Sequence, residues 1–216
     1  MIGYVITIDD DDRSKSAAQR CIDTAASFGL VVKNHSAYTP RNCDPVERLQ
    51  SLGISSAGFY EKYSRYENAI AAFLSHYSLW ERCWKSGEPL FVFEHDAVVL
   101  APVPKIPFKG LMSIGAPSYG KYNDPLTMGV NPLTSKPYLP GAHAYAINPF
   151  GAKAILDEIH NSGQAGPTDV FLNINRFPWL QEYYPWPVHA NDSFSTIQKR
   201  EGCLAKHNFN KAYTHL

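Results

Sequence analysis

The chain lacks an excess of charge of either sign. Its 216 residues carry 20 Lys and Arg against 20 Asp and Glu, so the formal net charge is zero. Sequence-independent binding to nucleic acid requires a basic surface, and the overall charge argues against that class of function. A local exception is the basic stretch at about 198–211, which carries four basic side chains and a single acid. We interpret this stretch as a solvated tail or, alternatively, as a patch that faces an acceptor or a membrane.

Cysteine and long apolar runs are also scarce. The four cysteines are scattered along the chain and form no C-x-x-C pair, which argues against a zinc or redox site. No apolar stretch is long enough to span a bilayer. The N-terminus also lacks a basic segment followed by an apolar run, which is the pattern of a signal peptide. We therefore expect a cytoplasmic protein with reduced thiols and no stable membrane insertion.

Internal repeats and low-complexity linkers are absent, so we expect one domain over residues 1–216. The apolar content of 44% and the charged content of 19% are typical of a globular protein. At the start of the chain, an apolar strand at 2–8 precedes a helical pattern at 14–28 and a second strand that begins at 30. A strand–helix–strand unit is the usual opening of a parallel α/β sheet.

The rest of the chain continues this alternation less regularly. A helix over about 66–85 ends at Gly87, and a buried strand at 89–93 follows. After a strand at 111–114, we expect residues 116–139 to form a long loop over a site, because long unstructured loops are often functional. The remaining expected elements are a strand at 140–147, a helix at about 150–160 and a helix that opens at 167.

The apolar run at 89–93 stops at two carboxylates separated by one residue, Glu94-His95-Asp96. Buried carboxylates are costly unless they are paired, hydrogen-bonded or bound to a metal. At the carboxyl end of a parallel strand they project into the crevice where open α/β sheets bind ligands. The triplet therefore indicates a ligand site; the alternative is an acidic strand end that simply turns to solvent.

Separated blocks of the sequence, taken in order, point to one family. The blocks are Tyr4–Asp9, Leu74-Ser75-His76 with Trp80, Phe93–Ala97, Gly141–Tyr145 with Gly151-Ala152-Lys153, Pro167-Thr168-Asp169 and Ser195-Thr196-Ile197. This set resembles glycosyltransferase family 25, the lipooligosaccharide and collagen galactosyltransferase family, over most of the chain. The chain departs from the family pattern at His95, where the family usually has Asp, and at 68–72, where the family usually has Gly-Glu-Ile-Gly-Cys.

The resemblance implies an α/β domain with a GT-A-like (Rossmann-like) nucleotide-sugar fold and a mostly parallel central sheet. It also implies a metal-assisted, inverting transfer of a hexosyl or pentosyl group, from a nucleotide-diphosphate sugar such as a UDP-sugar to an acceptor hydroxyl. A divalent cation would neutralise the diphosphate leaving group, and Mn²⁺ or Mg²⁺ prefer oxygen ligands. We expect Asp96 as the first metal ligand and Glu94 on the metal or the ribose hydroxyls. His189 and Asp192 are candidates for a third ligand.

An inverting transfer needs a base for the acceptor proton. The resemblance assigns this role to Asp169, with Glu94 as the second catalytic residue; the alternative for Asp169 is a helix N-cap. The residues expected to bind the donor are Thr7, Asp9, Arg13, Ser75, His76, Glu94, His95 and Asp96. The residues expected to bind the acceptor are His143, Tyr145 and Thr168. Three of the residues expected to bind the donor have an alternative role. Arg13 could pair with the neighbouring aspartates, His76 could be a core residue, and His95 could point into the sheet.

The sequence is compatible with more than one class of acceptor. A surface glycan, as in lipopolysaccharide biosynthesis, is the family default. The chain also resembles compact members encoded by tailed bacteriophages, so a hydroxymethylated DNA base in the host cytoplasm is a second acceptor. His95 in place of the usual acid motivates another interpretation, a nucleotide-sugar-binding module without catalysis. An unrelated α/β domain with chance matches would not bring Glu94, Asp96 and Asp169 into one cleft.

Overall fold

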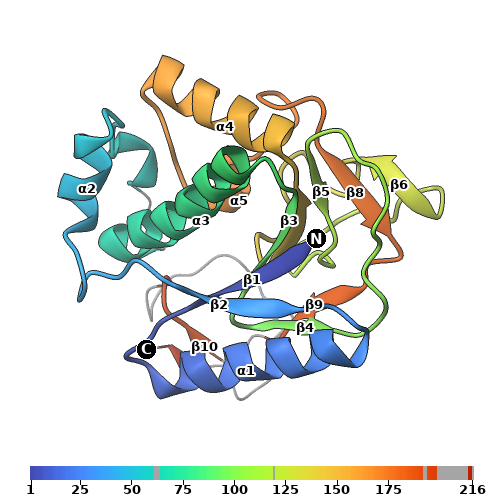
Figure 1. Ribbon diagram of the computed structural model, residues 1–216. Coiled ribbons are helices and arrows are strands. Elements are labelled where there is room, and N and C mark those ends of the chain that lie inside the picture. The colour runs from blue at the N-terminus through green and yellow to red at the C-terminus, as the bar shows by residue number, and fades with distance from the viewer. Residues whose placement is uncertain (61–63, 119, 192–193, 199–213, 216) are drawn as a thin grey trace.

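A mixed sheet lies between two layers of helices (Figure 1). The computed structural model describes residues 1–60, 64–118, 120–191, 194–198 and 214–215. The strand order of its 7-stranded sheet is β2 (Val32–Ser36), β1 (Ile2–Thr7), β3 (Leu90–Glu94), β7 (Ala144–Ile147), β5 (Leu111–Ser113), β8 (Gln181–Tyr184) and β6 (Gly129–Pro132). β1 pairs in parallel with both β2 and β3, whereas β7 and β6 run in the opposite direction to the other strands. The predicted α/β class is confirmed, and the sheet is mostly parallel at its core, although it is mixed as a whole.

One face of the sheet is covered by α1 (Asp12–Ser27), which lies against β4 (Ala97–Val99). β4 pairs antiparallel with β9 (Val188–Ala190) in a separate 2-stranded sheet. Asp11 caps the N-terminus of α1, because its carboxylate accepts hydrogen bonds from the backbone N–H groups of Arg13 and Ser14. The helix ends before Gly29, whose φ of 71° is a left-handed conformation that glycine adopts without strain. The helix predicted at 14–28 is thus confirmed.

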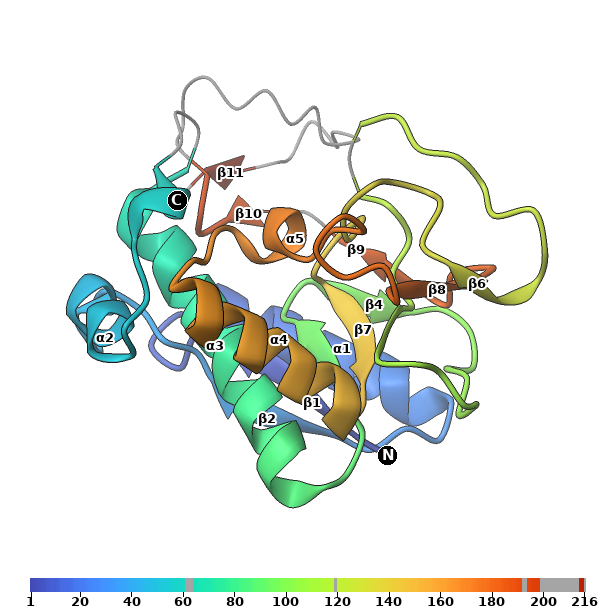
Figure 2. The ribbon, with the colours of Figure 1, turned by 90° about the horizontal axis from the view of Figure 1, so that it is seen from above.

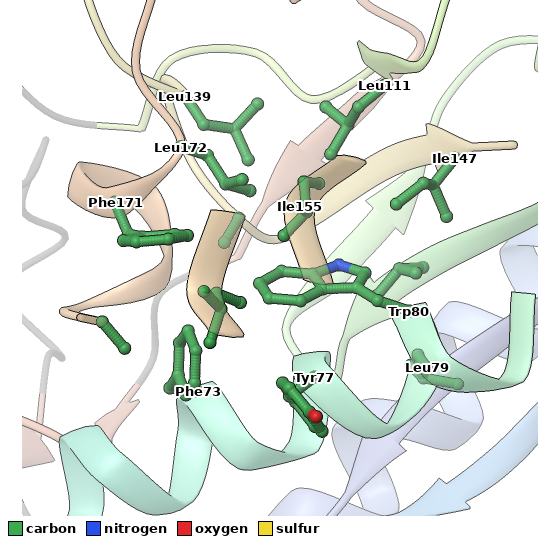
Figure 3. Close-up of a cluster of buried hydrophobic side chains, with 14 of the residues drawn as sticks. Phe73, Tyr77, Leu79, Trp80, Leu111, Leu139, Ile147, Ile155, Phe171 and Leu172 are labelled. Atoms are coloured by element: carbon green, nitrogen blue, oxygen red, sulfur yellow. The ribbon is translucent and has the colours of Figure 1, made fainter. Parts of the chain in front are cut away.

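The other face carries α3 (Tyr66–Ser86), α4 (Pro149–Ser162) and the four-residue α5 (Thr168–Phe171). Figure 3 shows Phe73 and Trp80 of α3 pointing toward Ile155 of α4 and Phe171 of α5. Phe73 makes edge-to-face contacts with both Trp80 and Phe171, with ring centroids 5.7 Å and 6.0 Å apart. This cluster holds α3 in place, and the first half of α3 forms a wall of the cavity described below.

Short elements complete the chain. The irregular region at 39–63 contains the expected short helix, α2 (Pro45–Ser51), and a 3-10 turn, η1 (Ala57–Phe59). β10 (Phe194–Ser195) and β11 (Thr214–His215) pair with each other. Among the helices of the described residues, none has the length and apolar character needed to cross a membrane.

The long loop predicted at 116–139 is the main correction to the predicted fold. It contains β6, which pairs antiparallel with β8 at the edge of the sheet. Glu182 of β8 is fully buried, and its Oε1 accepts hydrogen bonds from the backbone N–H groups of Thr134 and Ser135 at 2.7 Å and 2.8 Å. One carboxyl oxygen that accepts from two backbone N–H groups anchors them both, so the segment that follows β6 is fixed to the sheet.

Candidate functional site

A cavity of about 760 Å³ lies at the carboxyl ends of β1 and β3. β1 is the point at which the strand order reverses, because the chain passes from β1 to β2 on one side and later returns to β3 on the other. Open α/β sheets bind ligands in the crevice at this switch point. Ile6 and Ile8 of the first strand region, Glu94 to Asp96, and the first half of α3 line the cavity.

The three carboxylates that the sequence singled out line this one cavity. Glu94 and Asp96 come from the end of β3, and Asp169 comes from α5, on a distant part of the chain. The interpretation of chance matches in an unrelated domain required these carboxylates to lie apart, and on this point it is wrong. Thr168 also lines the cavity and is buried.

Glu94 is the best-supported carboxylate of the cavity. Its Oε1 lies 3.1 Å from Nε2 of His76, which is 1% exposed, while 34% of the Glu94 side chain stays accessible. Burial raises the pKa of Glu94, but the hydrogen bond from His76 and the nearby imidazoles of His76, His143 and His95 outweigh this and bring the pKa below its ordinary value. Glu94 is therefore ionised at neutral pH and presents an acceptor to a ligand.

Hydrogen bonds connect His76 to the buried side chains of Tyr145 and Trp80. Its Nδ1 lies 2.9 Å from the hydroxyl of Tyr145, and the indole Nε1–H of Trp80 donates to the same hydroxyl at 2.9 Å. Tyr145 is fully buried and does not line the cavity, so the prediction that it binds the acceptor is wrong. Its contact is with His76, and through His76 with Glu94.

His95 joins the cavity wall and does not turn into the sheet. Its Nδ1 lies 2.9 Å from Oγ of Ser14, which also accepts a hydrogen bond from the backbone N–H of Ile8. The ring stacks on Phe194 with centroids 5.0 Å apart. His95 thus connects the end of β3 to the start of α1 and to the C-terminal segment.

His143 lines the cavity although it is almost fully buried. Its ring fits between two glycines: a Cβ atom would lie 2.3 Å from the ring Nε2 at Gly115 and 2.5 Å from Nδ1 at Gly141. Only glycine leaves room for the ring at both positions. The backbone carbonyl of His143 accepts a hydrogen bond from the N–H of Glu94 at 2.9 Å, which fixes the two residues to each other.

Ser75 and Arg13 line the cavity as predicted, but their polar groups have partners within the protein. The hydroxyl of Ser75 donates to the carbonyl of Ala71 and accepts from the N–H of Tyr38, so Ser75 fastens the loop after β2 to α3. The guanidinium of Arg13 lies 3.5 Å from the Asp11 carboxylate, which confirms that Arg13 pairs with a neighbouring aspartate.

Two predicted donor residues do not line the cavity, Thr7 and Asp9. Successive side chains of a strand point to opposite faces, and Ile6 and Ile8 are the residues that face the cavity. Thr7 is buried, with its hydroxyl 3.0 Å from Oδ1 of Asn34, and Asp9 is exposed.

The structure does not bring the predicted metal ligands together as one set. His189 is exposed on β9, pairs with Val98 of β4 and does not line the cavity, and Asp192 lies outside the described residues. Within the part of the chain that the structure describes, no group of three or more His, Cys, Asp or Glu side chains is placed to hold a metal ion. The oxygen donors of Glu94 and Asp96, two residues apart on the cavity wall, match the preference of Mn²⁺ or Mg²⁺.

Asp169 is not the N-cap of its helix, because Pro167 occupies that position. Its Oδ1 accepts a hydrogen bond from the backbone N–H of Val170 at 2.9 Å. Burial lowers the pKa of Lys136 in the segment after β6, and the Asp169 carboxylate opposes that effect.

Parts of the cavity wall were not predicted from the sequence. The loop at 37–41 forms one wall, and Arg41 binds Asp10 through two contacts of 2.7 Å. The segment 194–198, which includes β10, forms another wall (Figure 2). Two hydrogen bonds of 2.7 Å connect this segment to the start of α3. The backbone N–H of Arg65 donates to the carbonyl of Ile197, and Nδ2 of Asn68 donates to the carbonyl of Thr196. Only the Ser195-Thr196-Ile197 block hinted at this segment.

The cavity thus combines an ionised glutamate, a second carboxylate beside it, three histidines and a further carboxylate, Asp169, from α5. Such a site can bind hydroxyl groups or a cation next to Glu94 and can accept a proton at Asp169. No protein-family model matches this chain, and no curated protein is significantly similar to it.

Proposed function

We propose that this protein is a glycosyltransferase that moves a sugar from a nucleotide-diphosphate donor, such as a UDP-sugar, to an acceptor hydroxyl. The proposal is supported most directly by the convergence of Glu94, Asp96 and Asp169 on one cavity at the switch point of the sheet. Its volume of about 760 Å³ is within the range typical of sites for small ligands and cofactors.

In this proposal the residues divide between the two substrates. Glu94 accepts hydrogen bonds from the ribose hydroxyls of the donor or joins Asp96 in holding a divalent cation. The cation, when bound, supplies positive charge for the diphosphate leaving group. Asp169 takes the proton of the acceptor hydroxyl. This role depends more on the distance between the carboxylate and the bound acceptor than on the basicity of the carboxylate alone.

Donor binding is the first test. We expect UDP with Mn²⁺ to bind the full chain in isothermal titration calorimetry, and the variants Glu94→Gln and Asp96→Asn to bind about tenfold or more weakly, because each loses a charged contact. The matched control is Glu88→Gln, an exposed position outside the cavity. If no nucleoside diphosphate binds, or if all three variants behave alike, the proposed donor site is refuted.

Transfer is the second test. We expect release of UDP from a UDP-sugar to increase with the right acceptor and to fall about 100-fold in Asp169→Asn, while Asp124→Asn, at an exposed site away from the cavity, retains activity. Saccharide acceptors and DNA with hydroxymethylated bases form separate arms of the screen. Metal-dependent UDP binding without release or transfer, for every common donor and both acceptor classes, would favour a binding module without catalysis.

A further inference from the structure

We infer that Trp80 and Tyr145 are positioning residues that fix one tautomer of His76 and hold the Glu94 carboxylate in a single orientation at the cavity. The role of Glu94 toward a donor rests on the proposed function. The hydrogen-bond chain itself rests on contacts within the protein. Neither Trp80 nor Tyr145 reaches the cavity, so any effect on a ligand must pass through His76 and Glu94.

The chemistry of the atoms determines which group donates and which accepts in each hydrogen bond of this series. The indole N–H of Trp80 can only donate, so the Tyr145 hydroxyl oxygen accepts from it at 2.9 Å. The remaining contact of that hydroxyl is Nδ1 of His76 at 2.9 Å, and its own proton is free to donate there. In the neutral imidazole Nδ1 therefore accepts, and its one proton resides on Nε2, which donates to Oε1 of Glu94 at 3.1 Å.

Burial makes this direction hard to reverse. Trp80 and Tyr145 are fully buried and His76 is 1% exposed, so water does not compete for their hydrogen bonds. With the opposite tautomer, Nδ1–H would face the Tyr145 hydroxyl, and the hydroxyl proton would lose its acceptor. A buried donor without an acceptor is unfavourable, and a low-polarity surrounding increases that cost.

The hydrogen bonds from Trp80 through Tyr145 and His76 determine which ligand groups Glu94 can bind. One carboxylate oxygen accepts from His76, while 34% of the side chain remains accessible in the cavity. A carboxylate fixed as an acceptor is matched by a hydroxyl group or a cation and repels a phosphate oxygen. The part of the ligand that meets Glu94 is therefore a hydroxyl-bearing group, such as a ribose or hexose diol, or a metal ion.

The decisive measurement is the tautomer of His76 in the ligand-free full chain, read from long-range ¹H–¹⁵N correlations of the imidazole ring. In the native protein we expect the Nε2–H form. In Glu94→Gln the anion is gone, and the Gln amide can either accept or donate. If Trp80 and Tyr145 set the tautomer, Nε2–H persists in this variant. A shift to Nδ1–H or to a mixture would show that Glu94 alone determines it and would overturn the inference.

A double variant, Glu94→Gln with Tyr145→Phe, provides the positive control because both directing groups are removed. We expect a mixture of tautomers there, with folding verified by circular dichroism. If the double variant does not fold, the single variant still decides the question. These outcomes need no ligand, so they stand apart from success or failure of the UDP experiments.

The functional consequence is read by replacing His76. In His76→Gln the side chain retains an acceptor for Tyr145 and a donor for Glu94, whereas His76→Phe has neither. We expect UDP with Mn²⁺ to bind His76→Gln about tenfold more tightly than His76→Phe, a difference of about 1.4 kcal/mol. Equal affinities would refute the positioning role. Failure of UDP to bind even the native chain would refute the proposed function and leave the tautomer result intact.

Discussion

Protonation of His35 should destabilise the folded protein below neutral pH. The ring Nε2 lies 2.7 Å from Oγ of Ser78, whose own proton is donated to the carbonyl of Ser75 at 2.8 Å. Nε2 therefore carries the proton, and a second proton would have to go to Nδ1. Burial lowers the pKa of His35 from 6.5 to about 4, with contributions from Arg82 and His76 that outweigh the opposing effect of Asp9.

The direction of this pH effect on stability follows from the linkage between proton binding and folding. The folded pKa lies below the unfolded value, so between pH 6.5 and about 4 the unfolded chain binds a proton that the folded chain does not. This contribution to stability is present above the unfolded pKa and is lost as the pH falls toward the folded pKa. The full shift corresponds to about 3 kcal/mol, and screening of the partly exposed ring reduces the expected effect to about 1–2 kcal/mol.

The assay is urea unfolding, followed by circular dichroism at about pH 7 and about pH 5. The comparison variant is His35→Gln, whose amide can still donate to Ser78 but does not titrate. All other titrating groups are common to both proteins, so the difference between their pH dependences isolates His35. About half of the full effect falls between pH 7 and pH 5, so we expect the native protein to lose about 0.5–1 kcal/mol more than the variant over this interval. Parallel losses would show that the neutral state of His35 does not contribute to stability.

Two further predictions concern packing. Phe73→Ala should lower the free energy of unfolding by about 3–5 kcal/mol, because it leaves a cavity at the centre of the aromatic cluster. The control Leu126→Ala, at a fully exposed position, should change the free energy of unfolding by less than about 0.5 kcal/mol. Similar urea midpoints for the two variants would contradict the assignment of Phe73 to the core. Gly115→Ala should cost about 1–3 kcal/mol, because its Cβ would lie 2.3 Å from Nε2 of His143. An unchanged melting temperature together with unchanged ring signals of His143 would refute that contact.

Elements with a strong local pattern were predicted well. The apolar face of α3 and the glycine that ends it, Gly87 with φ 71°, are set by neighbouring residues in the sequence. The edge strand β6 and its neighbour β8 were missed because they are short and their pairing is non-local. β6 contains Pro132, and the partner that makes it a strand lies about 50 residues further along the chain.

The same contrast applies to the site. Family-like blocks located Glu94, Asp96 and Asp169 in the sequence, and the structure brings them to one cavity. Those blocks did not specify which way each side chain points, so Thr7 and Tyr145 were placed in a site that they do not face. Side-chain direction depends on strand register and on packing between layers, neither of which the sequence alone determines.

The histidine at position 95 is the middle residue of the Glu94-His95-Asp96 triplet, and its surroundings explain what it does. His95 contributes to holding the pKa of Glu94 down, whereas an aspartate in its place would repel the carboxylate and raise that pKa. A histidine at this position therefore favours Glu94 as an ionised acceptor at neutral pH. Glu94 and Asp96 are then the two anionic oxygen donors of the triplet, and in the proposed function a divalent cation would bind to them and to oxygens of the donor diphosphate. With a neutral or cationic middle residue, the triplet suits recognition of hydroxyl groups better than three carboxylates would.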